Sequence, residues 1–166
     1  MTIINVSEVN GATNLQRQGT EVGHLIVPMF DRVHVTQTDI LWDQTGTNEF
    51  PKGSGTASRI YRIPVDLTRY DQMRLSFHIV SGAASASTAS LHYAPADTGA
   101  LTGHVGSASP TLSLTGTNVR RDTGWVDMNS GAQASVWLAI LQTATGSAGT
   151  TREITRMVAE FRATSA

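Results

Sequence analysis

Hydrophobic and polar side chains alternate with a period of two through the middle of this chain. Three stretches place apolar residues at every second position: Tyr61, Ile63, Val65 and Leu67; Leu75, Phe77 and Ile79; Leu91 and Tyr93. The positions between them are mostly polar, among them Arg62, Arg74 and His78. This alternation is typical of β-strands in antiparallel sheets, which bury one face and leave the other in water. We expect the strands at 59–67 and 72–80 to be neighbours joined by a tight turn.

Short extended segments continue on both sides of this region. Further strands are predicted at 21–35, 40–42, 88–94, 112–114, 125–128, 135–141 and 154–162. No stretch has a sustained helical period, and glycine, serine and threonine fill the intervals. The pattern predicts an all-β protein, an antiparallel β-sandwich of the jelly-roll type with eight to ten strands.

Local features refine this prediction. Pro28 has no N–H to donate, so it indicates an edge strand, a bulge or a break. Residues 43–58 are rich in glycine and predict a long loop. Segment 135–141 is apolar on both faces, so both must be covered. The last strand points Met157, Ala159 and Phe161 one way, and Arg156, Val158, Glu160 and Arg162 the other.

The length of 166 residues predicts one domain, residues 21–166, preceded by an arm and linker at 1–20. The arm begins with Ile3, Ile4 and Val6 and then becomes polar. An extended apolar arm could add a strand to an exposed sheet edge of a neighbouring subunit. The alternative is that it forms the first strand of its own sheet.

Composition narrows the classes of function. The chain has no cysteine, which excludes disulfides and thiolate chemistry. A net charge of −1 with 15% charged residues provides no field for gathering phosphates, so no nucleic-acid partner is expected. There is no signal-peptide pattern and no apolar run of membrane-spanning length, so we expect a soluble product made in the cytoplasm. Eleven of the twelve basic residues are arginine, which suits protein interfaces, although a GC-rich coding sequence would give the same bias.

The histidines are the candidates for a metal site. His24 and His34 flank Asp31, and His78 and His92 fall on the outward positions of strands that could lie close together. Facing imidazoles with a carboxylate can hold a divalent metal. No HxH or HExxH spacing is present, so we favour surface or hydrogen-bonding histidines and expect neither a metal nor a cofactor.

Catalytic motifs are missing as well. There is no GxSxG element, and the carboxylates Asp31, Asp39, Asp43 and Glu49 share only a region of the sequence. A hydrolase would depend on Asp31 or His34, but we expect no enzyme and no catalytic residue. Trp42 and Trp125 lie next to loops and could form a platform for sugar rings, with filling of the core as the favoured alternative.

The C-terminal two thirds of the chain resemble a known class of protein. The segments are SLHYAPADTG at 90–99, TLSLTGTNVRRDTGWVDM at 111–128 and ASVWLAILQTATGSAGTTREITRMVAEFRA at 134–163. Together they resemble the β-sandwich modules of tailed-bacteriophage virion proteins. The resemblance implies a structural role, as a capsid decoration or cement protein or as part of a head or tail fibre, usually in a homo-oligomer.

These observations lead to one functional expectation. We expect a virion protein that acts through interfaces with copies of itself, with a trimer favoured, and with other virion proteins such as the major capsid protein. The predicted interface residues are Ile3, Ile4 and Val6 in the arm and Arg156, Val158 and Arg162 on the last strand. The alternative is a glycan-binding module that uses Trp42 and Trp125.

Overall fold

The computed structural model describes residues 23–35, 46–50, 62–82, 87–97, 100–144 and 152–164. These residues form eleven strands and one short 3-10 turn, η2 (Ser130–Ala132). The strands are β1 (Gly23–Val35), β2 (Gly46–Phe50), β3 (Ile63–Asp66), β4 (Gln72–Ser81), β5 (Ser87–Ala94), β6 (Gly103–His104), β7 (Leu112–Ser113), β8 (Thr117–Asp122), β9 (Val126–Asp127), β10 (Ser135–Ala144) and β11 (Arg152–Ala163).

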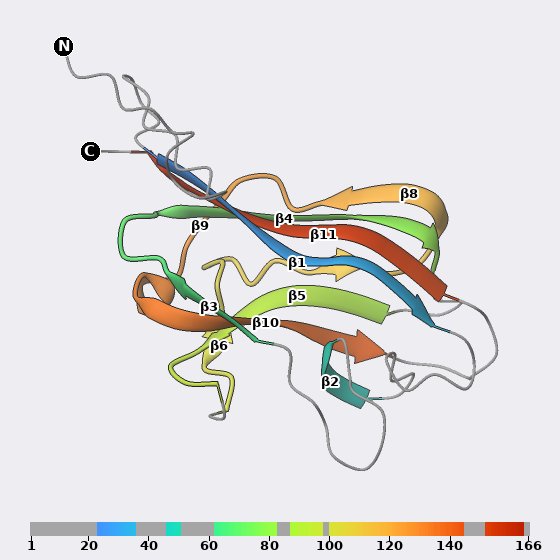
Figure 1. Ribbon diagram of the computed structural model, residues 1–166, viewed down its shortest axis with the longest axis horizontal. Coiled ribbons are helices and arrows are strands. Elements are labelled where there is room, and N and C mark those ends of the chain that lie inside the picture. The colour runs from blue at the N-terminus through green and yellow to red at the C-terminus, as the bar shows by residue number, and fades with distance from the viewer. Residues whose placement is uncertain are drawn as a thin grey trace.

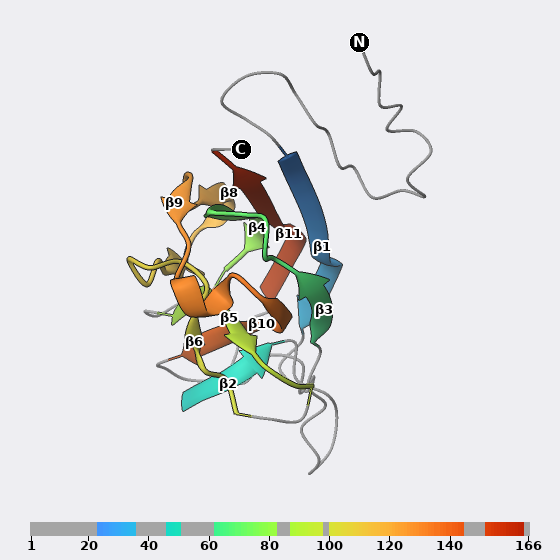
Figure 2. The same cartoon turned by 90° about the vertical axis from the view of Figure 1, so that its left-hand side faces the viewer.

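The strands make two antiparallel sheets packed face to face (Figures 1 and 2). The β4–β11 sheet has the order β1-β11-β4-β8, with β9 also paired to β4. The β5–β10 sheet has the order β2-β10-β5-β6, with β3 also paired to β10 and β7 to β5. The predicted all-β sandwich is therefore confirmed, and the strands beyond the expected eight to ten include the two-residue pairings of β6, β7 and β9.

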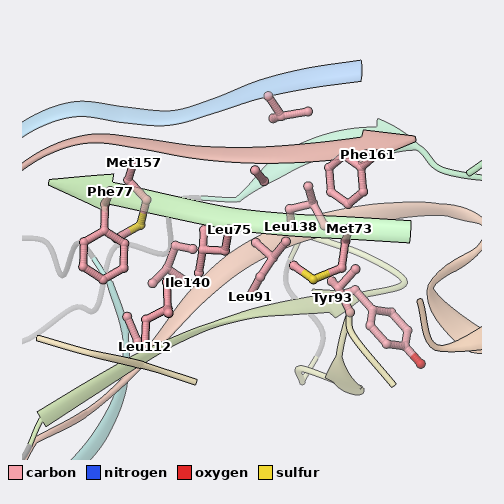
Figure 3. Close-up of a cluster of buried hydrophobic side chains, with 14 of the residues drawn as sticks. Met73, Leu75, Phe77, Leu91, Tyr93, Leu112, Leu138, Ile140, Met157 and Phe161 are labelled. Atoms are coloured by element: carbon pink, nitrogen blue, oxygen red, sulfur yellow. The ribbon is translucent and has the colours of Figure 1, made fainter. Parts of the chain in front are cut away.

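The hydrophobic core fills the space between the sheets. Alternate residues of each strand point inward, so the apolar positions of the sequence pattern meet there. Figure 3 shows them: Met73, Leu75, Phe77, Met157 and Phe161 come from one sheet, and Leu91, Leu138 and Ile140 come from the other. None of these eight side chains is more than 2% exposed.

Strand β10 is covered on both faces, as its sequence predicts. Leu138 and Ile140 point into the core, and Ala139, on the opposite face, is also fully buried. The strand lies inside its sheet, paired with β5 on one side and with β2 and β3 on the other. Both edges of β10 are therefore paired, and its apolar side chains are buried on both faces.

The expected pairing of the strands at 59–67 and 72–80 is wrong. β3 pairs with β10, whereas β4 belongs to the opposite sheet. The turn between them is closed locally: the Asp66 carboxylate accepts hydrogen bonds from the Thr68 N–H (3.0 Å) and hydroxyl (2.7 Å). At the end of β3, the Leu67 N–H donates a hydrogen bond to Ala134 O (3.0 Å). The turn after it carries the chain across the sandwich to β4 in the opposite sheet.

Two further expectations concern the first half of the chain. Residues 43–58 are not loop throughout, because Gly46–Phe50 pairs with Ile140–Ala144 of β10. Pro28 does mark an irregularity: β1 pairs only with β11 among the described strands, and its register shifts between Pro28 and Phe30. The arm at 1–20 and the strand expected at 40–42 lie outside the described residues.

Phe161 should be essential to the packing of the two sheets. Its side chain is fully buried on the central strand β11, so Phe161→Ala leaves a cavity and lowers the free energy of unfolding by about 3–5 kcal/mol. Val80→Ala is the matched control, because Val80 is 38% exposed and should change stability by about 0.5 kcal/mol or less. Urea unfolding of both variants measures the difference, and equal losses would contradict this assignment of the core.

Candidate functional site

The polar side chains of the β4–β11 sheet point away from the core and form what we call the outer face. Register places these side chains in rows across the strands. The rows are His24, Arg162, Gln72 and Asp127; Ile26, Glu160 and Arg74; Pro28, Val158, Ser76 and Asp122; and Thr155, His78 and Arg120. Three of the predicted interface residues, Arg156, Val158 and Arg162, lie on this face.

Trp125 packs at one end of the outer face rather than in the core. The Arg162 guanidinium lies 4.4 Å from the centre of the Trp125 ring, and the His24 ring meets it edge-on at 5.7 Å. Arg162 Nε and Nη2 both donate to Gln72 Oε1, at 2.8 and 2.6 Å. Gln72 Nε2 in turn donates to Asp127 Oδ1 at 2.9 Å. One face of the indole is therefore taken by a cation, which leaves Trp125 poorly suited to stack on a sugar.

Asp122 is the anionic centre of the same face. Arg74 Nε donates to both carboxylate oxygens, at 2.9 and 3.0 Å, and Arg74 Nη2 also binds Asp122. The hydrogen bonds from Arg74 lower the pKa of Asp122 and raise that of Arg74. Arg120 reaches Asp122 only at 3.3 Å, and its side chain is 64% exposed. Asp122 is thus neutralised mainly by Arg74, which leaves the Arg120 guanidinium largely accessible.

A groove of about 810 Å³ lies in the middle of the outer face. It runs across four strands and is lined by Ile26, Ser76, Phe77, His78, Arg120, Thr155, Arg156, Val158 and Glu160. The Phe77 side chain is buried in the core, so its backbone is what faces the groove. Asn118 Oδ1 lies 3.1 Å from His78 Nε2 and positions that ring.

The groove coincides with a β-bulge in β11. Against β4 the register shifts between Thr155 and Val158, so two residues of β11 stand opposite Phe77 alone. A bulge of this kind turns a side chain that would otherwise point inward. Thr155 and Arg156 both line the groove, whereas Met157 is fully buried. At the bulge, Arg156 adopts a strained, left-handed backbone conformation, with φ at +55°.

The outer face of the β5–β10 sheet contains the second cluster of ionisable groups. His92 and His104 are register partners, and their rings lie 4.1 Å apart. His92 Nε2 lies 3.0 Å from Ser90 Oγ, and burial, followed by the nearby His104, lowers the pKa of His92 to about 4. Burial also lowers the pKa of His104. His78 and His92, which the sequence allowed to lie close together, belong to opposite sheets.

The remaining candidate residues do not assemble into a reactive site. Glu49 is bound by Arg62, whose Nε and Nη2 donate to the carboxylate at 3.0 and 2.7 Å. The other candidates lie outside the described residues or have side chains that do: Ile3, Ile4, Val6, Asp31, His34, Asp39, Trp42 and Asp43. Among the described residues no three His, Asp or Glu side chains gather as a metal site.

The groove residues on β1, β4 and β8 were not predicted. Ile26, His78 and Arg120 are far apart in the sequence, and only the pairing of their strands brings them together. The single local signal was Pro28, whose missing donor indicated an irregularity at the level where the groove lies.

Comparison with known proteins adds no family to this description. The sequence matches no protein-family model, and no curated protein matches it. Within the described residues, no helix has the length and apolar character needed to cross a membrane.

The left-handed backbone of Arg156 should lower the stability of the protein. Glycine adopts a left-handed backbone without the Cβ clash, so Arg156→Gly should raise the free energy of unfolding by about 1 kcal/mol. Arg156→Ala keeps the strain and serves as the control. A loss of stability in the glycine variant, measured by urea unfolding, would show that the arginine side chain holds the bulge together.

His92 should make the fold sensitive to mild acid. The unfolded chain takes up a proton near pH 6.5, whereas the folded chain resists it until about pH 4. Stability is therefore full above pH 6.5 and falls between pH 6.5 and 4, by up to about 3 kcal/mol. The lowered pKa values of Asp66 and Asp122 act only below this window.

Unfolding followed across this pH range should show a shallower loss in His92→Asn than in the unaltered protein. His78→Asn, on the other sheet, is the matched control and should keep the full loss. Identical curves for all three proteins would contradict the role of His92.

Proposed function

We propose that this chain is a structural, non-catalytic protein that binds other proteins through the outer face of its β4–β11 sheet. The main support for this proposal is that exposed large apolar side chains lie on this outer face. Ile26 and Val80 are the large hydrophobic residues that the described part of the chain leaves exposed, at 40% and 38%. Both lie on the outer face, beside the groove or on the strand that forms it.

The chemistry around these two residues is typical of a protein interface. Interface centres favour arginine and aromatic residues over lysine and aspartate. The outer face presents Arg120, Arg156 and Arg162 together with Trp125. The arginine and tryptophan side chains offer flat surfaces that can be buried by a partner while their polar atoms keep hydrogen bonds. This supports contacts through side chains over a wide face rather than a deep ligand pocket.

The particle to which the protein would belong is a tailed-phage virion. Support for this comes from the resemblance of segments 90–99, 111–128 and 134–163 to virion β-sandwich modules. Those segments supply β7 to β11 and most of β5, so they include the strand that holds Arg156, Val158 and Arg162. We propose a homo-oligomer, with a trimer favoured, attached to other virion proteins such as the major capsid protein. Its place of action would be the virion.

The glycan-binding alternative is less well supported. It would need an indole with an open face, and Arg162 stacks on one face of Trp125. Its second candidate, Trp42, lies outside the described residues.

Solution mass tests the proposed self-association. Light scattering coupled to size exclusion should give a mass near three times the 17.7 kDa of one chain. Removal of residues 1–20 should reduce the number of chains in each oligomer. Val80→Asp should also reduce the mass, because it puts a charge into the proposed contact outside the groove.

Thr143→Asp is the matched control for the charge substitution. Thr143 is exposed on β10 of the other sheet, so this variant should keep the full mass. A monomer in every form would contradict the homo-oligomer. Only attachment to an existing scaffold would then remain for the structural role.

A further inference from the structure

The groove on the outer face has an apolar end and a cationic end. Ile26 lies at one end, on the edge strand β1 and opposite Glu160 of β11, and Val158 stands opposite Pro28, the next outward residue of β1. Arg120 lies at the other end, on β8, and Arg156 rises from the bulge between them. We propose that this groove binds an extended, acidic segment of a partner protein, with a carboxylate placed between Arg156 and Arg120. The inference rests on the proposed function in taking the ligand to be a protein.

The cations of the groove are available to a ligand. No described side chain makes a hydrogen bond or ion pair with the Arg156 guanidinium. Arg120 has only the 3.3 Å contact to Asp122, which Arg74 already neutralises. A carboxylate is the group that two such guanidinium ions bind best, because their fork of N–H donors matches its oxygens.

The acidic residue of the groove does not cancel this charge. Glu160 lies 3.2 Å from His24 Nε2, and its register partner on β4 is Arg74. Its negative charge therefore faces the Arg74 cation on β4, at the end of the groove away from Arg120. The cationic end keeps a local excess of positive charge, which attracts an acidic partner.

The shape of the groove favours an extended chain. It crosses four strands, which at the usual strand spacing is a length of about 14 Å, or roughly four residues of extended chain. Ile26 and Val158 offer contacts to an apolar side chain. Hydroxyl groups of Ser76 and Thr155 can bond to the peptide groups of such a segment. An alternation of apolar and acidic residues would fit both ends.

The backbone around the groove is held in costly conformations. Arg156 at φ +55° and Asn118 at φ +51° are both left-handed, and Asn118 orients His78. Such strain is common where a side chain must be aimed at a ligand. For Arg156 the strain has a specific result, because the bulge turns this cation outward into the groove.

A peptide titration followed by backbone amide NMR tests the inference on the full chain. The probe is Ac-Val-Glu-Val-Glu-Val-NH2, and the matched control peptide replaces both glutamates with glutamine. We expect saturable shifts at Ile26, His78 and residues 155–158, and an affinity at least about fivefold weaker for the glutamine peptide. Equal affinities, or shifts spread over other surfaces, would overturn the inference.

Variants of the protein separate recognition from folding. Arg156→Gly should weaken binding about tenfold while its thermal midpoint stays the same or rises, because the substitution relieves strain. Arg156→Lys should keep part of the affinity. Arg69 lies in the exposed turn before β4, outside the groove, so Arg69→Ala should keep the full affinity. Full binding by Arg156→Gly would overturn the role of Arg156.

Two other ligands are outcomes of the same experiment. Saturable binding of glucuronate without binding of the glutamate peptide would show an acidic sugar site and overturn the protein ligand. Binding of a peptide of residues 1–10 alone would show that a second copy of the chain is the occupant, which also overturns the inference. The solution mass is read separately, so a monomeric protein that binds the glutamate peptide contradicts the homo-oligomer but keeps the groove.

Discussion

Strand β11 must pair with two neighbours while it separates a dry face from a wet one, and the rest of the structure depends on how it does so. Its inner residues Met157, Ala159 and Phe161 are fully buried, and its outer residues contact β1 and β4 through side chains. The strand is too long to keep one alternation from end to end, since Ile154 is buried as well. Ile154 and Met157 both point inward although they are three positions apart, whereas regular alternation needs an even separation, so the strand needs one extra residue between them. The bulge at Arg156 supplies it.

The same adjustment links the core to the surface. Because the bulge restores the inward direction of Met157, the core stays filled, and because it turns Arg156 outward, the outer face gains a cation. The neighbouring rows are already satisfied by Arg74 with Asp122 and by Arg162 with Gln72. Charge that is matched within the sheet holds its side chains in place, while the charge at the bulge stays open to an outside partner.

The sequence predicted the elements well and their partners less well. Alternation identified β4, β5 and β11, and the double apolar pattern of 135–141 indicated cover on both faces, which agrees with the burial of Leu138 and Ala139. Alternation records which face is buried but not which strand lies alongside, so β3 and β4 were wrongly paired across a short turn. β2 was hidden because Gly46 and Asn48 resemble loop residues, and only pairing with β10 makes them a strand.

The candidate site was predicted in part for the same reason. Arg156, Val158 and Arg162 were placed on one outward face from their spacing, and all three lie on the outer face, with Arg156 exposed and Val158 and Arg162 half-buried. Trp125 was expected at a loop or in the core, and it lies against Arg162 instead, a contact between residues 37 positions apart. The histidine pair of His92 and His104 depends on the register of a two-residue strand, which no sequence pattern indicates.

The irregularity near Pro28 has a consequence for how this protein meets others. β1 is a 13-residue strand that pairs on one side only among the described strands, and a long free edge of this kind is a template for uncontrolled association. Pro28, which has no N–H to donate, and the register shift beside it interrupt that edge and divide it into two shorter runs. An interrupted edge is a poorer template for uncontrolled backbone pairing, so this irregularity protects the fold at its most exposed strand.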